Sequence, residues 1–325
     1  MQFITDIAND SFSKLGNNNG FEVFKSIDNK IYLIYSNNNR AIISYDLINK
    51  KKLTEIKSAH NKNITNFRYI LDNINKRDLV ISVSAEDNNI KLWNINIWEC
   101  LYNIVNIYKY GLIYSACFLN FNNNIYIVTS NYLFNKGAEP IKIFDLNGKK
   151  IKELKDSKGR GENTHFIDTF NKRNSSKAYI IASKERFIKI YDYKENKVYN
   201  SIYVDYCSNI IINEKNENIN LITPCADGFV RIWDFDSAKL LIKIKISNIG
   251  LSEACLSNKG YLFVAIADNS IKMIDLNKRK IITSLIGHNN IVRTIKTINI
   301  QGYGECVISQ GQDSDKIKLW IFKIK

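Results

Sequence analysis

The chain has 325 residues, of which 46 are Lys or Arg and 32 are Asp or Glu, so its formal net charge at pH 7 is +14. A hydrophobic content of 45% with only 2 Pro and 14 Gly is typical of a folded globular chain and excludes a disordered one. The excess of Lys accompanies many Asn and Ile residues, a combination that AT-rich codons supply, so the charge alone is weak evidence for an acidic partner.

The opening residues show no sign of a targeting signal. Met1–Asp6 has neither a basic region followed by an apolar core nor a small-residue cleavage site. No later apolar run approaches the ~18 residues that a transmembrane helix needs. We therefore predict an intracellular protein without a transmembrane segment, with the cytoplasm as the expected compartment and the nucleus as the alternative.

One short pattern recurs seven times along the chain. In six cases an apolar residue, a basic residue and a second apolar residue precede an aromatic residue or Ile; in the first case Ile42-Ile43-Ser44 precede Tyr45. An Asp follows in five of the seven cases. The aromatic or Ile position falls at Tyr45, Trp93, Phe144, Tyr191, Trp233, Ile274 and Trp320, with gaps of 48, 51, 47, 42, 41 and 46 residues. A period of this size indicates stacked repeats, none of which can bury its apolar surface alone.

Each of the first six repeats contains four short apolar stretches separated by Asn- and Lys-rich turns. In the first repeat these stretches are Phe21–Ile27, Ile31–Ser36, Ala41–Leu47 and Leu53–Ile56. Stretches in the middle of a repeat, such as Leu262–Ile266, are apolar at every position, which is typical of a strand with both faces covered. The sequence therefore predicts an all-β protein built from four-stranded antiparallel sheets.

On these residues the chain resembles the WD40-repeat family of β-propellers, whose repeats run roughly 40–45 residues with four strands per blade. The resemblance covers essentially the whole chain, although Trp233-Asp234 is the only complete Trp-Asp pair. It implies a single domain, residues 1–325, folded as a seven-bladed β-propeller of four-stranded antiparallel blades.

The resemblance also implies how the last blade is completed. The chain ends five residues past Trp320, which leaves the last repeat with three strands, whereas Gln2–Ile7 form one orphan strand before the first complete repeat. In this family the N-terminal segment commonly supplies the outer strand of the final blade, which removes an exposed break. We expect residues 2–7 to complete the seventh blade.

WD40 blades carry a structural hydrogen-bond network of His, Ser or Thr, Asp and Trp, in which the buried donors find partners. Carried over by resemblance, the last blade supplies His288, Ser309, Asp313 and Trp320; the second supplies His60, Asp87 and Trp93, with either Ser82 or Ser84; and the fifth supplies Thr223, Asp227 and Trp233. Two of the three histidines therefore have structural roles. His165 fits no family position well, and we interpret it as a loop or strand-end residue.

The sequence offers no set of residues suited to catalysis. Three scattered histidines accompany no carboxylate pair of recognisable spacing, and the six cysteines lie singly with no C-x-x-C pair. Gly159-Arg160-Gly161 does not match a phosphate-binding loop. We predict that the protein is not an enzyme and that it has no catalytic residue, no metal ligand and no cofactor.

The top face of the predicted propeller is the first candidate binding surface. The third repeat has a long insertion, Ser130–Glu139, where a plain turn would suffice. Aromatic and Arg side chains on exposed loops are typical of interface hot spots. The candidate partner-binding residues are Tyr108, Tyr110, Tyr132, Phe134, Arg160, Arg186, Tyr206 and Arg293. In the alternative interpretation, Leu133 and Phe134 pack back onto their own blade.

The opposite rim is the second candidate surface. The turns between the third and fourth strands contain Lys50–Lys52, Lys149-Lys150, Lys194 with Lys197, Lys239, and Lys278–Lys280. Such a rim could hold RNA, an acidic peptide or an anionic membrane. Aromatic residues are not interleaved with these lysines, as a base-stacking platform would require, so a solvated face is the simpler interpretation.

Together these observations predict a non-catalytic scaffold that presents its top-face loops to a protein or peptide partner, within a multi-protein complex. The alternative is an RNA- or ribosome-associated module that binds acidic partners through the lysine-rich rim. Affinity that depends on phosphate contacts falls steeply as the salt concentration rises, whereas affinity that depends on a protein hot spot changes little. The salt dependence of partner binding therefore distinguishes the two functions.

Overall fold

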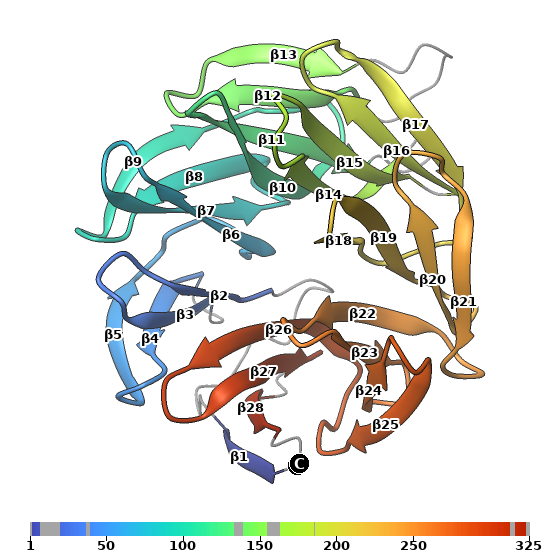
Figure 1. Ribbon diagram of the computed structural model, residues 1–325. Helices are drawn as coiled ribbons and strands as arrows, with labels where there is room; N and C mark the ends of the chain where they lie inside the picture. The colour runs from blue at the N-terminus through green and yellow to red at the C-terminus, as the bar shows by residue number, and fades with distance from the viewer. Residues whose placement is uncertain are drawn as a thin grey trace. The chain divides into compact units, whose positions relative to one another are not determined.

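The computed structural model describes residues 2–6, 20–36, 40–132, 139–154, 163–184, 186–312 and 316–322. Within these ranges all regular structure is β, arranged as seven four-stranded antiparallel sheets (Figure 1). These sheets are the blades of a seven-bladed β-propeller, which confirms the predicted fold class.

The first five repeats each form one sheet, in which the strands pair in chain order. The first two sheets comprise β2 (Glu22–Lys25), β3 (Ile31–Ser36), β4 (Ile42–Asp46) and β5 (Lys51–Ile56), then β6 (Asn66–Asp72), β7 (Arg77–Ser84), β8 (Asn89–Asn94) and β9 (Glu99–Ile104). The next three comprise β10 (Leu112–Phe121), β11 (Asn124–Tyr132), β12 (Ile141–Asp145) and β13 (Lys150–Leu154), then β14 (Thr164–Asn171), β15 (Ala178–Lys184), β16 (Phe187–Asp192) and β17 (Lys197–Tyr203), then β18 (Ile211–Lys215), β19 (Asn218–Pro224), β20 (Phe229–Asp234) and β21 (Leu240–Lys245).

The sixth sheet is formed in chain order like the first five, whereas the seventh takes one strand from the start of the chain. The sixth contains β22 (Leu251–Leu256), β23 (Tyr261–Ile266), β24 (Ile271–Asp275) and β25 (Lys280–Leu285). The seventh contains β26 (Val292–Ile300), β27 (Gly304–Gly311) and β28 (Ile317–Ile321), and its fourth strand is β1 (Gln2–Asp6) from the other end of the chain.

The chain separates into two compact units. One comprises Met1–Phe67, Pro224–Val230 and Lys243–Lys325, and the other comprises Arg68–Thr223 and Arg231–Ile242. The assignment of all 325 residues to a single domain stays a prediction.

Buried apolar side chains join neighbouring sheets within each unit. In the first unit, Leu33 of β3 packs in one cluster with Ile308 of β27 and Leu319 of β28. In the second unit, Ile81 of β7 shares a cluster with Ile127 of β11. A middle strand is therefore covered on both faces, which explains why its sequence is apolar at successive positions and not at alternate ones.

The turn after the third strand of a sheet is held by the Asp that ends that strand. In the first sheet the Asp46 carboxylate accepts hydrogen bonds from the backbone N–H groups of Ile48 and Asn49, both at 2.9 Å, and from the Asn49 side-chain amide at 2.8 Å. Asp275 of the sixth sheet accepts the N–H groups of Asn277 and Lys278, both at 3.0 Å. The recurring Asp is therefore a turn-forming residue that satisfies backbone donors.

The seventh sheet is completed as the sequence predicts. Strand β1 pairs antiparallel with β28, with Gln2 opposite Ile321 and Phe3 opposite Trp320, and the register shifts between Phe3 and Thr5. Residue 7 lies outside the described ranges. Without β1, the strand β28 would present an unpaired row of backbone N–H and C=O groups.

We expect deletion of residues 1–8 to lower the melting temperature by about 5 °C or more, because it removes a whole ladder of backbone hydrogen bonds from one sheet. Differential scanning calorimetry of the full chain and of the truncated chain measures the effect. A truncated chain that melts at the temperature of the full chain would show that this pairing contributes nothing to stability.

The turn at Asp46 yields a pH-dependent contribution to stability. Burial alone would raise the pKa of the Asp46 carboxyl, but the hydrogen bonds from the Asn49 and Ile48 N–H groups and the Asn49 amide outweigh burial and hold the pKa below its ordinary value of 3.8. Because the folded-state pKa lies below the unfolded-state pKa, the carboxylate stabilises the fold above about pH 4, and this contribution is lost as the pH falls through the folded-state pKa.

We therefore expect Asp46→Asn to reduce the free energy of unfolding by about 1 kcal/mol at pH 7. The difference from the wild type should shrink as the pH falls below about 4, because the wild-type carboxylate then becomes protonated. Urea denaturation of both proteins between pH 7 and pH 3 measures this difference. A difference that stays constant across this range would mean that the Asp46 charge is not what stabilises the turn.

Candidate protein-interaction surface

Each sheet has one end at which its first strand begins and the turn between its second and third strands lies, and we call this end the top edge. In four sheets the first strand begins with a β-bulge, where the pairing register shifts by one residue. The additional residues are Tyr114, His165, Ser252 and Arg293. A bulge redirects a side chain that regular pairing would point elsewhere. The top edge therefore presents an irregular backbone from which individual side chains project.

Four aromatic rings gather at the top edge of the third and fourth sheets. Tyr114 lies 5.6 Å from Tyr132, measured between ring centroids, and 5.7 Å from His165 in an edge-to-face arrangement. His165 also lies 5.6 Å from Tyr132 and 5.0 Å from Tyr206. Such spacings and tilted orientations are those that aromatic pairs prefer. We call these four residues the aromatic cluster.

The aromatic cluster is assembled from four separate elements. Tyr114 comes from β10, Tyr132 ends β11, His165 comes from β14, and Tyr206 lies in the connection between β17 and β18. Tyr206 is 44% exposed, whereas the other three rings are half-buried. His165 packs against the Tyr206 ring edge-to-face, and a ring that is already packed loses less side-chain entropy when a partner binds.

Basic and aromatic side chains surround the cluster. Arg186 is exposed, and its carbonyl accepts the N–H of Val204 at 2.9 Å, which places it beside the segment that carries Tyr206. Tyr110 is 53% exposed, and its N–H donates to Glu139 Oε1 at 2.9 Å. Its carbonyl accepts a hydrogen bond from the Asn131 side-chain amide at 3.0 Å, next to Tyr132 in the chain. The structure thus brings Tyr110, Tyr132, Arg186 and Tyr206 to the top edge of one unit.

Tyr108 does not belong to this exposed surface, and its expected exposure was wrong. Its side chain is only 2% exposed, and its hydroxyl donates to the Thr129 carbonyl at 2.7 Å. Burial raises the pKa of the Tyr108 hydroxyl, and the Lys142 ammonium lies 4.5 Å from its ring centroid. The connection containing Tyr108 folds inward against β11 and β12, so this aromatic residue is part of the core.

The remaining candidate residues fall elsewhere. Arg293 is exposed in the other unit, where its Nε and Nη2 both donate to Gln312 Oε1, at 3.0 and 2.8 Å. Phe134 and Arg160 lie outside the described residues. Tyr114 and His165 are the two cluster members that the sequence analysis missed. Like Arg293, they are the additional residue of a bulge near the start of the first strand, and this equivalence is the signal that could have found them.

The Trp residues of three repeats are held by hydroxyl groups. Trp320 Nε1 donates to Ser309 Oγ at 2.7 Å, and His288 Nε2 lies at hydrogen-bond distance, 2.7 Å, from the same oxygen. Trp93 Nε1 donates to Ser82 Oγ at 2.8 Å, which selects Ser82 over Ser84. Trp233 Nε1 donates to Thr223 Oγ1 at 3.1 Å. These contacts satisfy buried donors and leave the three indoles with structural roles.

The other network residues lie in or near turns. His60 is 2% exposed, whereas Asp87 is half-buried and Asp227 is exposed. Asp227 Oδ1 accepts the backbone N–H of Phe229 at 3.3 Å. Asp313 lies outside the described residues.

The described residues bring no metal-binding group together, and cysteines among them have raised pKa values. Among them, no three His, Cys, Asp or Glu side chains are close enough together to hold a metal ion. Burial raises the pKa of Cys306 to about 11, and the pKa of the exposed Cys100 is also raised, chiefly by desolvation. A raised pKa keeps a thiol protonated and weakly nucleophilic. No helix in the described part of the chain is long and apolar enough to cross a membrane.

The lysines of the predicted basic rim are partly neutralised in their own turns. Lys52 lies 2.8 Å from Glu55, and Lys150 lies 2.6 Å from Glu153. Lys197 and Lys278 have carboxylate neighbours at 3.8 and 3.9 Å. Such exposed pairs are weak, but they lower the local positive potential that would attract a polyanion.

The seven four-stranded sheets, with the Trp–Ser and Trp–Thr hydrogen bonds of three of them, define a β-propeller. Comparison with known proteins extends this only slightly, since no protein-family model matches the chain. The chain is 29% identical over 76 residues to the U3 small nucleolar RNA-associated protein 21 homolog of Schizosaccharomyces pombe. That match covers 23% of this chain and 8% of the relative, so the chain spans only a small part of the relative's length.

Two glycines in similar turns separate the effect of backbone strain from that of steric conflict. The N–H of Gly228 donates to the Cys225 carbonyl at 3.1 Å with φ at +81°, and the N–H of Gly260 donates to the Ser257 carbonyl at 3.0 Å with φ at +82°. A Cβ at Gly228 would lie 2.1 Å from the Ser247 carbonyl oxygen, whereas a Cβ at Gly260 would meet no heavy atom within 4 Å.

We expect Gly260→Ala to cost about 1 kcal/mol of stability, which is the strain of a left-handed conformation alone. Gly228→Ala should cost about 3 kcal/mol or more, because the turn must also move away from the backbone of residue 247. Urea denaturation curves of the two variants and the wild type give both values. Equal losses of unfolding free energy in the two variants would show that the close approach of Gly228 to residue 247 does not constrain this turn.

Proposed function

We propose that this protein is a non-catalytic WD40-type propeller that acts as a scaffold and binds a protein or peptide at its top edge, as one member of a multi-protein complex. The observation that carries the proposal is the aromatic cluster, in which Tyr206 is exposed beside Arg186 and near Tyr110. We further propose that it acts inside the cell, in the cytoplasm or the nucleus.

The chemistry of the cluster supports a protein partner. Tyr and Arg are enriched among the few residues that supply most of the binding energy at interfaces. Tyr206 offers a large amphipathic ring whose neighbour His165 already restricts it, so little side-chain entropy is lost on binding. Tyr110 adds a second exposed ring, fixed through its backbone by Glu139 and Asn131.

An RNA- or ribosome-associated role through the lysine-rich rim is the second candidate. Two observations favour it: the net charge of +14, and the name of the relative in Schizosaccharomyces pombe, which describes that protein as associated with a small nucleolar RNA. The carboxylates that neighbour Lys52, Lys150, Lys197 and Lys278 count against a strong polyanion site.

The proposal is tested by capture of partners from native cells with the tagged full chain and with Tyr206→Ala. We expect the variant to bind its main partner about thirtyfold more weakly, because removal of a hot-spot ring typically costs about 2 kcal/mol or more, while its melting temperature stays that of the wild type. Quantitative mass spectrometry of the captured proteins provides the measurement.

Tyr303→Ala is the matched control, because Tyr303 is also 44% exposed but lies in the turn between β26 and β27. This control should capture partners as the wild type does. Capture that is unchanged by Tyr206→Ala argues against the cluster as the binding site. Capture that is lost on ribonuclease treatment and falls steeply between low and moderate salt would favour the second candidate.

A further inference from the structure

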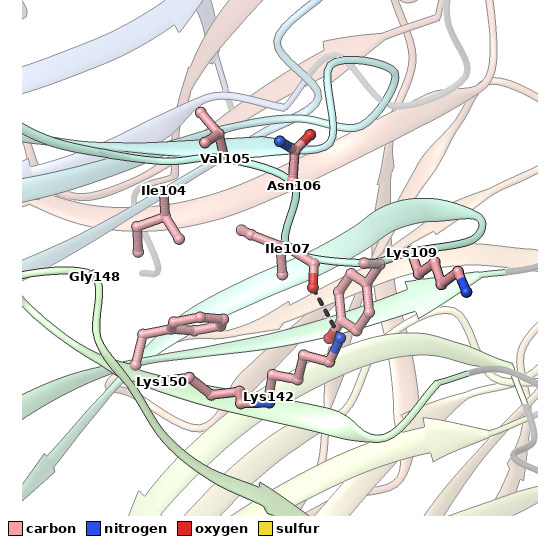
Figure 2. Close-up of a pocket in the computed structure, with 10 residues that line it drawn as sticks. Ile104, Val105, Asn106, Ile107, Lys109, Lys142, Gly148 and Lys150 are labelled. Carbon is pink, nitrogen blue, oxygen red and sulfur yellow. Dashed lines mark hydrogen bonds between the residues drawn. The ribbon is translucent and has the colours of Figure 1, made fainter.

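A pocket of about 640 Å³ lies in the second unit, between the end of β9 with the segment that follows it and the strand β12 (Figure 2). Its volume is within the range of about 300–1,000 Å³ typical of ligand sites. The segment 104–109 forms one wall, and Lys142, Phe144 and Lys150 form the opposite wall. It is distinct from the aromatic cluster, and no part of the proposed scaffold function requires it.

One side of the pocket is fixed by a buried lysine. Lys142 is 8% exposed, and its Nζ donates to the Ile107 carbonyl at 2.8 Å and to Glu139 Oε2 at 2.7 Å. The same ammonium lies over the Tyr108 ring. These three contacts use the donors of Lys142 and bind the segment 104–109 to β12, so the pocket is shaped before any ligand enters.

The charged side chains that line the pocket are all cationic, namely Lys109, Lys142 and Lys150. Lys109 is exposed, and among the described residues its ammonium has a contact with the Tyr110 ring at 5.1 Å and no carboxylate partner. Lys150 is exposed and paired with Glu153, and it lies on the wall opposite Asn106 (Figure 2). None of the described residues lining the pocket is Asp or Glu. The pocket therefore suits a ligand that brings acceptors and negative charge.

The walls distinguish a carboxylate side chain from a nucleotide. Recognition of single-stranded nucleic acid requires an accessible ring face on which a base can stack. Here the Tyr108 ring is buried beneath Lys142, and Phe144 is only 6% exposed. Val105, 53% exposed, offers a small apolar surface that matches the methylene groups of a glutamate side chain.

We propose that this pocket is an anion subsite that binds carboxylate side chains of an acidic peptide segment, held by the exposed ammonium groups of Lys109 and Lys150. The ligand displaces no buried group, because Lys142 keeps its partners and only exposed cations form new contacts. The net charge of +14 raises the local concentration of such a segment and speeds its approach.

The test uses fluorescence polarisation of the full chain with a labelled peptide of alternating glycine and glutamate, and with the same peptide carrying glutamine in place of glutamate. We expect the glutamate peptide to bind and the glutamine peptide to bind much more weakly. Lys109→Gln should weaken binding of the glutamate peptide about two- to fivefold, the range that loss of one exposed charge pair gives. Lys109→Arg, which keeps the charge, should restore it.

Lys259→Gln is the control, because Lys259 is an exposed lysine of a turn in the other unit and its loss changes the net charge equally. Equal weakening by Lys109→Gln and Lys259→Gln would overturn the proposal, because it would show general attraction to a basic protein. A labelled oligouridine that binds more tightly than the glutamate peptide and is equally sensitive to Lys109→Gln would also overturn it, in favour of RNA. Circular dichroism of each variant confirms that it is folded.

Discussion

The structure depends on burial of both faces of each small sheet. A four-stranded sheet of short strands has two apolar faces in its middle, and no single sheet of this size can cover them itself. Leu33 and Ile43, on neighbouring strands of the first sheet, are fully buried only because they share a cluster with Ile308 and Leu319 of the seventh. The same arrangement recurs in the other unit, where Ile81 shares a cluster with Ile127. Stability therefore comes from the contacts between sheets, and each sheet depends on its neighbours.

This constraint leaves the ends of the strands as the positions where sequence can vary. The turn after the third strand is closed by an Asp such as Asp46 or Asp275, which satisfies backbone donors without a contribution from the core. At the top edge, bulges at Tyr114 and His165 redirect side chains while their strands keep the same apolar residues inward. The aromatic cluster is built from positions at or near the ends of strands. A surface for recognition can thus be altered without disturbing the shared faces.

Much of the fold could be predicted from the sequence, because strand burial leaves a direct mark on it. Leu262–Ile266 is apolar at every position and is the central strand β23, and the orphan segment at the start pairs with β28 as expected. The choice between Ser82 and Ser84 could not be made, because it depends on which residue of β7 lies opposite Trp93, and strand register is a property of the paired backbone.

The candidate surface was less predictable, for reasons that individual residues make clear. Tyr108 and Tyr110 are two residues apart in the same connection, yet one is buried and the other exposed. The difference arises because Lys142, distant in sequence, fixes the connection against β12 and covers the Tyr108 ring. The aromatic cluster joins side chains from β10, β11, β14 and the segment before β18. Because these residues are distant in sequence, no local sequence pattern indicates that they lie together.

The pairing of Gln2 with Ile321 has a consequence for how the chain is made. A ribosome that adds about 5–20 residues per second needs roughly 15–60 s to reach the C-terminal strand after it has released the N-terminal one. During that interval β1 lacks its partner, so the seventh sheet cannot be completed until β28 has been synthesised. Strand β1 precedes every other described strand in the chain, yet it is among the last of them to be paired.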